Sequence, residues 1–222
     1  MNEPTLAEVV RRELDSAILE AQAAAVVLDA GCGRVSALRP YRERIGRFVG
    51  ADIHAPAPGA VPHLDEFVTA DLCADPGAFP AESFDVVLSS FTVEHFDDPG
   101  AAFANMRRWL RPGGRLVLTT VNRRHPFVWA YLVLPVRIRD RIQRLVKATA
   151  TDAHPLVGAC NTPAALHRAL VAAGFADVRI TTVGHLARAW GRWLPGRILG
   201  VVGDTLARPF SARRSTIVVS AA

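Results

Sequence analysis

Cysteine and long apolar runs are both scarce in this sequence. Its 222 residues include three cysteines, Cys32, Cys73 and Cys160. Three thiols spaced so widely form neither a disulfide framework nor the paired pattern of a zinc site. The apolar run at residues 127–134 falls well short of the length that crosses a bilayer, and the first residues carry no apolar signal core. We therefore expect a cytoplasmic protein without a membrane span.

Aromatic residues and acidic charge are also limited. Phe, Trp and Tyr make up 7% of the chain, although half of its residues are hydrophobic. Lysine and arginine number 26 against 21 acidic residues, which gives a net charge of +5 and an isoelectric point near 9.8. A chain of this length and composition can bury a sizeable core as one globular domain. The basic surplus favours contact with an anionic surface, either nucleic acid or lipid, without choosing between them.

The stretch VVLDAGCGR at residues 26–34 organises the rest of the chain. Its β-prone start predicts a buried strand that runs into Asp29, followed by a glycine turn and a short helix over residues 36–41. Gly31 and Gly33 allow a ligand to approach the backbone closely, because neither has a Cβ. Asp29 would repel the pyrophosphate of a dinucleotide but attract a ligand that carries an ammonium group. S-adenosylmethionine (SAM) is such a ligand.

Two further strands are each expected to end in an acidic residue. Asp52 closes a strand over residues 47–52 and lies 23 positions after Asp29. That distance is close to the spacing of roughly 20 residues for an acid that binds ribose hydroxyls. A carboxylate that caps a helix is the alternative. Asp71 follows a short strand over residues 67–70.

Three stretches resemble motifs of the class I SAM-dependent methyltransferases. DAGCG follows the first strand, FDVVLSS at residues 84–90 continues into FTVEHFDDP, and LRPGGRLVLTT occupies residues 110–120. The chain resembles in particular the small-molecule methyltransferases related to the ubiquinone-biosynthesis enzymes. Family sequences often have a third glycine two residues after the second, and here that place is Val35.

The resemblance implies a fold and a cofactor site. The fold is an α/β, Rossmann-like, seven-stranded mixed sheet in the order 3-2-1-4-5-7-6, with helices on both faces. The site would place Asp52 on the ribose, Asp71 on the exocyclic amine of adenine, and Ser90 beside the methionine part of SAM. A loop aspartate that caps the next turn is the alternative for Asp71. The expected cofactor-binding residues are Asp29, Gly31, Gly33, Asp52, Ile53, Asp71, Leu72 and Ser90.

We expect a single methyltransferase domain, residues 1–222, that contains one insertion. Its core comprises residues 24–122 and 161–222, and residues 123–160 form a helical lid over the pocket. A threonine cap and a proline at residues 162 and 163 predict that a helix begins directly after the lid.

Two histidines are candidates for the chemistry. His95 follows the fourth strand, where it could serve as a general base near neutral pH. The alternative is a helix-terminal histidine satisfied by Asp97 and Asp98. His125 follows the fifth strand, a position suited to contact with the methyl acceptor.

A metal site is not expected. In methyltransferases of ubiquinone biosynthesis, Glu-x-x-Glu-His at this place binds a divalent cation. Glu94 and His95 match that pattern, but Phe91 occupies the position of the first glutamate. With one carboxylate lost and no other ligand near in sequence, we predict no metal. The ring of Phe91 could instead lie near the sulfonium or an apolar acceptor.

The function expected is transfer of a methyl group from SAM to a small, apolar acceptor under the lid, with S-adenosylhomocysteine (SAH) as product. An RNA methyltransferase suits the charge, but neither an RNA-binding module nor a base-methylating motif is present, so no nucleic-acid partner is expected. An NAD-dependent oxidoreductase is disfavoured by Asp29 and by Ser36 at the third fingerprint glycine. A non-catalytic SAM-binding protein remains open, as do the acceptor, the atom methylated and the oligomeric state.

Two basic segments suggest a further contact. In the lid, Ile138, Ile142, Leu145 and Val146 share one helix face bordered by arginines. Residues 186–208 repeat the combination with Trp190 and Trp193. Such segments can lie on an anionic leaflet, so a peripheral contact with the inner face of the membrane is one interpretation. The alternative is that both apolar faces pack on the sheet and the arginines are solvated.

Overall fold

The computed structural model describes residues 3–21, 24–33, 36–57, 59–139, 141, 158–189 and 194–222. Several residues named above lie outside this part of the chain: Val35, Ile142, Leu145, Val146, Trp190 and Trp193.

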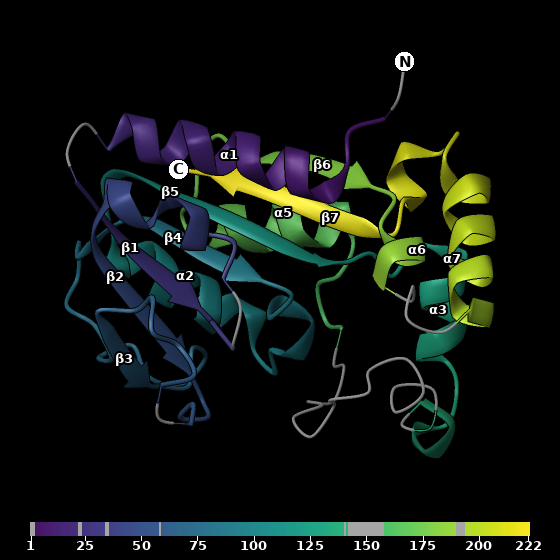
Figure 1. Ribbon diagram of the computed structural model, residues 1–222, viewed down its shortest axis with the longest axis horizontal. Helices are drawn as coiled ribbons and strands as arrows, with labels where there is room; N and C mark the ends of the chain where they lie inside the picture. Colours follow the sequence, from purple (N-terminus) through teal and green to yellow (C-terminus); the bar gives the residue numbers. More distant parts are fainter. Residues whose placement is uncertain are drawn as a thin grey trace.

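Seven strands form one sheet in the order β3-β2-β1-β4-β5-β7-β6, which confirms the predicted order (Figure 1). The strands are β1 (Ala25–Ala30), β2 (Ile45–Asp52), β3 (Glu66–Thr69), β4 (Phe84–Ser90), β5 (Leu110–Val121), β6 (Arg179–Val183) and β7 (Thr216–Ala221). The first five pair in parallel, and β7 is antiparallel to both β5 and β6. Six strands therefore point their carboxyl ends toward the same edge of the sheet, where open α/β folds bind ligands.

Helices cover both faces of the sheet (Figure 1). They are α1 (Leu6–Glu20), α2 (Pro99–Trp109), α3 (Pro126–Leu132), α5 (Pro163–Ala172), α6 (Leu186–Ala189) and α7 (Leu194–Ala207), with short 3-10 helices η1 (Arg39–Arg44), η2 (Val93–His95) and η3 (Ser211–Arg213). In β1, Val27 belongs to the core shared with α1, whereas Leu28 belongs to the core shared with α2 and α5. This alternation between two buried faces explains why the central strands read as nearly continuous apolar runs.

The helix caps follow from the sequence. Thr5 caps α1: its hydroxyl accepts from the Glu8 backbone N–H, and the Glu8 carboxylate accepts from the Thr5 N–H, which is a complete capping box. Thr162 caps α5 in the predicted place, with Pro163 as the first helical residue.

Two local predictions were wrong. The helix expected over residues 36–41 is the 3-10 helix η1, which begins only at Arg39, because Pro40 favours a start at that point. The second concerns the sequence Leu-Arg-Pro-Gly-Gly at residues 110–114, which predicts a turn but belongs to β5, where Leu110 already pairs with Phe84. Gly113 keeps a positive φ of 78°, so a distortion of the strand occupies the place of the turn.

The chain leaves the sheet as helices at its carboxyl end. Helix α3 follows β5, and α6 and α7 follow β6, so that all three stand together beyond this edge (Figure 1). Of the predicted lid at residues 123–160, the structure describes residues 123–139, 141 and 158–160, which include α3 and a helical stretch at residues 136–139. Across the described residues, every helix is too short or too polar to span a bilayer.

Candidate active site

The glycine turn after β1 is held against the end of β2. The backbone N–H groups of Gly31 and Cys32 both donate to the Ala51 carbonyl, at 2.7 and 3.1 Å. Gly31 has a φ of 80°, and a Cβ added there would lie 2.3 Å from the side chain of Thr92. Both observations require glycine at this position. The turn therefore lies directly beside the segment that follows β4.

Asp52 connects this turn to the end of β2. One carboxylate oxygen accepts from the Gly33 N–H and the other from the His54 N–H, each at 3.1 Å. Each oxygen keeps a second lone pair, so the group can still accept from two vicinal hydroxyls. The neighbouring Ile53 is 46% exposed, unusual for isoleucine, and so leaves an apolar surface beside the carboxylate.

Asp29 is the most unusual titratable group of the site. Its carboxyl lies within the sheet, and burial raises its pKa to about 7, against a smaller opposing effect of a hydrogen bond from Ser36. The Oδ2 atom is buried and has no hydrogen-bond partner among the described residues. A buried, unpaired oxygen is costly. An ammonium group of a ligand would satisfy it and would favour the ionised carboxylate.

Asp71 and Leu72 both serve the fold. The Asp71 carboxylate accepts from the Cys73 N–H at 2.8 Å, which is the capping arrangement considered as the alternative. It remains exposed, so contact with adenine stays a prediction. The Leu72 side chain is buried in the core, and its carbonyl accepts from the side chain of Asn105.

Strand β4 ends in a strained position. The Ser90 hydroxyl lies 3.2 Å from the Thr119 hydroxyl on β5. The next residue, Phe91, has a φ of 54°, which costs a bulky residue about 1–3 kcal/mol and is found mostly at functional sites. Its ring stacks on that of His185, with centroids 6.2 Å apart. Helix α6 begins directly after His185, so this contact connects β4 with the helices beyond the sheet edge.

A buried polar chain lies behind His95. The Thr120 hydroxyl donates to the carboxylate of Glu94 at 2.7 Å, and the Asn161 amide donates to the Thr120 hydroxyl. The chain joins the ends of β4 and β5 to the start of α5. His95 itself is half-buried at the end of η2. Its role as a base stays a prediction.

His125 is fully buried at the start of α3. Its Nδ1 atom accepts from the backbone N–H groups of Phe127 and Val128, so the proton resides on Nε2. Burial lowers the pKa of His125, partly offset by the Gly203 carbonyl and by Asp204. The ring thus caps α3 and faces α7, and its predicted contact with an acceptor remains untested.

Sequence reasoning missed Thr92, His185 and Asp204. Thr92 could have been found from its place just after β4. His185 and Asp204 carry no sequence signal, because only the fold brings them near their partners. A cleft of about 720 Å³ lined by His185 and Asp204 opens between the N-terminal segment and α7, and none of the predicted cofactor-binding residues lines it.

Metal ligands do not gather anywhere in the part of the chain that the structure describes. The prediction that no metal binds is left for experiment.

Comparison with known proteins points to one family. A methyltransferase domain model matches residues 28–118. The chain is 35% identical over 187 residues to nocamycin O-methyltransferase of Saccharothrix syringae, which covers 77% of this chain and 65% of that protein. It is 31% identical over 110 residues to a ubiquinone biosynthesis O-methyltransferase of a Bradyrhizobium species, covering 44% of this chain and 40% of that protein.

The fold comparison agrees. A SAM-dependent methyltransferase structure from Archaeoglobus fulgidus superimposes with a TM-score of 0.57 at 17% identity, covering 97% of this chain and 94% of that one. The sheet order and the glycine turn define a Rossmann-like α/β fold, which this SAM-dependent methyltransferase structure shares. Residues 28–118 match a methyltransferase domain, and the chain is similar to two O-methyltransferases. It spans 65% of the length of the first relative and less than half of the second.

Proposed function

We propose that this chain transfers a methyl group from SAM to an oxygen of a small, apolar acceptor. The observation that carries the proposal is the buried Asp29 oxygen without a partner, beside a glycine turn that Asp52 holds in place. These two carboxylates suit the opposite ends of SAM: Asp29 its ammonium group and Asp52 its ribose hydroxyls. An oxygen acceptor is supported by the names of the two relatives, both O-methyltransferases.

The reaction asks the protein mainly for position. SAM supplies a methyl group on a sulfonium that is already an activated leaving group. The acceptor oxygen forms a bond to the methyl carbon while the carbon–sulfur bond breaks, and its electron pair remains on sulfur to give SAH. Asp29 and Asp52 would fix the donor, and the surrounding side chains would align the acceptor and exclude water. The acceptor's proton leaves to a base, for which His95 is our candidate.

The acceptor region is inferred from what adjoins Phe91. The Phe91 ring would lie next to the methionine part of SAM, and the ring of His185, the residue directly before α6, stacks on the Phe91 ring. Burial lowers the pKa of His185, with Asp204 opposing, so this imidazole is neutral at pH 7 and able to accept a hydrogen bond from an acceptor hydroxyl. We also infer a cytoplasmic location, which the three free cysteines support.

The proposal is tested by a labelling experiment. The protein is incubated with methyl-labelled SAM and one possible acceptor. In one set of reactions the acceptor is a member of a panel of phenolic and carboxylic acids, and in a separate reaction it is total tRNA. We expect label in the organic extract of at least one small acid and none in tRNA. Asp52→Ala should abolish labelling, whereas Glu43→Ala, which removes an exposed carboxylate on η1, should not.

Other outcomes contradict distinct parts of the proposal. Label in tRNA would establish the RNA alternative. SAM binding without transfer to any member of the panel would favour a non-catalytic binding protein. If His95 is the base, His95→Ala should bind SAH normally and turn over about 100-fold more slowly. Normal turnover would make His95 structural.

A further inference from the structure

Helix α7 presents its large apolar side chains to the outside. The residues buried on this helix are small: Gly196, Gly200, Gly203 and Ala207. Its large apolar residues are between 44% and 68% exposed: Leu194, Ile198, Leu199, Val201, Val202 and Leu206. A helix that simply covers a core buries its large residues and exposes polar ones. The outer surface of α7, defined by those six residues, is therefore unexplained by folding.

Close packing prevents α7 from rotating about its axis to bury its large apolar side chains. A Cβ at Gly200 would lie 2.6 Å from the Cα of Ala187 in α6. A Cβ at Gly203 would lie 2.8 Å from the Phe127 ring and 2.9 Å from the His125 ring. Only glycine fits at residues 200 and 203, so Leu and Val side chains cannot replace it there without displacing α3 or α6. The exposure of the outer surface is thus built into the packing.

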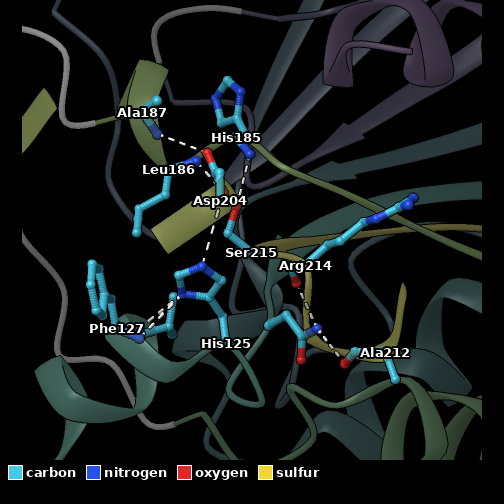
Figure 2. A network of polar contacts seen from close by, with 11 residues as sticks. His125, Phe127, His185, Leu186, Ala187, Asp204, Ala212, Arg214 and Ser215 are labelled. Atoms are coloured by element: carbon cyan, nitrogen blue, oxygen red, sulfur yellow. Dashed lines mark hydrogen bonds and ion pairs between the residues drawn. The ribbon is translucent and has the colours of Figure 1, made fainter. Parts of the chain in front are cut away.

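The charges of α7 reinforce this orientation. Its one acidic residue, Asp204, is turned inward: the carboxylate accepts from the Ala187 N–H at 3.0 Å and from the Ser215 hydroxyl at 2.7 Å (Figure 2). His125 approaches the same carboxylate, with 4.0 Å between Nε2 and Oδ1. The outer surface therefore carries no carboxylate. Exposed arginines flank it, namely Arg197 on the helix, and Arg208 and Arg213 beyond its end.

The neighbouring helix α3 also exposes apolar side chains. Helix α3 contacts α7 through Phe127, and the two lie side by side in Figure 1. On α3 and just after it, Trp129, Val133 and Val136 are each more than half exposed. Arg137, which follows, is exposed as well. Exposed apolar side chains with arginines next to them thus recur on both helices.

We propose that the outer surface of α7 docks on an anionic lipid bilayer. Leu, Ile and Val side chains can enter the acyl boundary, while the adjoining arginines reach the headgroups. Anionic lipid provides a counter-charge for Arg197 and Arg213, whereas Arg208 already pairs with Glu3, with 3.6 Å between Nε and Oε2. A second copy of the chain does not, because a symmetric contact through α7 would bring Arg197 of each copy toward like charge. The proposal is independent of the reaction.

Vesicle flotation tests the proposal directly. The full chain is mixed at low salt with vesicles of phosphatidylglycerol and phosphatidylcholine, and in parallel with phosphatidylcholine alone. We expect flotation with the anionic vesicles and release as salt rises. Ile198→Glu/Val202→Glu should reduce the bound fraction by about 10-fold or more, because two buried apolar contacts are exchanged for repelled charges.

A control variant distinguishes the effect of the α7 surface from the effect of net charge. Leu19→Glu/Val171→Glu adds the same two charges at apolar residues that are 65% and 51% exposed on α1 and α5. This control should float like the wild type, and all three proteins should unfold at the same denaturant concentration.

Three results would overturn the proposal. The wild type could stay in the lower fraction with anionic vesicles. Both double variants could lose binding equally, which would reflect net charge alone. Sedimentation could reveal a dimer that only the α7 variant dissociates, which would assign the outer surface of α7 to a second copy.

Discussion

Helices α1 and α7 are close in length, with 15 and 14 residues, yet they bury opposite kinds of side chain. Helix α1 buries large residues such as Val9, Leu14 and Ile18 against the sheet and exposes charged ones. Helix α7 buries glycines against α3 and α6 and exposes leucine and valine. The first arrangement is what folding alone selects. The second indicates that the surface of α7 has been shaped by something besides folding.

The comparison predicts a large difference in stability between two similar substitutions. Leu14→Ala should lower the free energy of unfolding by about 2–5 kcal/mol, because it leaves a cavity in a packed core. Leu206→Ala on α7 should change it by less than about 0.5 kcal/mol, since that side chain is already in solvent. Urea denaturation of both variants measures the difference. Equal losses would mean that α7 is packed as α1 is.

The free energy of unfolding should depend on pH through Asp29, a residue of the sheet. Burial raises the pKa of Asp29 from 3.8 to about 7. Between pH 4 and pH 7, the carboxyl is therefore protonated in the folded state and ionised in the unfolded state. The free energy of unfolding should therefore fall as pH rises from 4 to 7, by roughly 4 kcal/mol in total, and stay level above. Asp29→Asn should remove this slope. Denaturation curves of the wild type and of Asp29→Asn at several pH values measure this slope. The same slope in both proteins would contradict the raised pKa of Asp29.

The glycine surface of α7 allows a test in which two effects oppose one another. Helix propensity alone predicts that Gly200→Ala stabilises the protein by about 1 kcal/mol. The clash with the backbone of Ala187 should outweigh this, giving a net loss of about 1–3 kcal/mol. Thermal unfolding measures the sign. A stabilised variant would show that α6 and α7 are not in close contact.

The smallest expected effect concerns metal. SAH affinity should be unchanged by EDTA or by added magnesium or zinc, because Phe91 stands where the Glu-x-x-Glu-His pattern described above requires a glutamate. Calorimetric titrations in each condition compare the affinities. A metal-dependent affinity would overturn the prediction.

Sequence reasoning succeeded where structure follows from local pattern. The apolar run at residues 84–90 predicts a strand and forms β4. Thr5 and Thr162 both cap helices where their sequence patterns predict helix starts, because apolar periodicity and capping chemistry act over a few residues. The sheet order was available only through the family resemblance.

The failures involve contacts between distant segments. Nothing in the sequence near residue 110 indicates that β5 begins there by pairing with Phe84. The ring contact between Phe91 and His185 joins residues that are 94 positions apart in the sequence. The orientation of α7 had a signal that was not used: Gly196, Gly200, Gly203 and Ala207 recur at helical spacing, and such a row marks a closely packed side.

The central claim is that the carboxyl ends of β1 and β2 bind SAM. Calorimetric titration of SAH into the wild-type chain and into Asp52→Ala tests it without knowledge of the acceptor. We expect one SAH per chain, no binding of NAD, and an affinity weaker by about 2–4 kcal/mol in a folded Asp52→Ala variant, the loss of two charge-assisted hydrogen bonds. Unchanged affinity in that variant, or tighter binding of NAD than of SAH, would contradict the account.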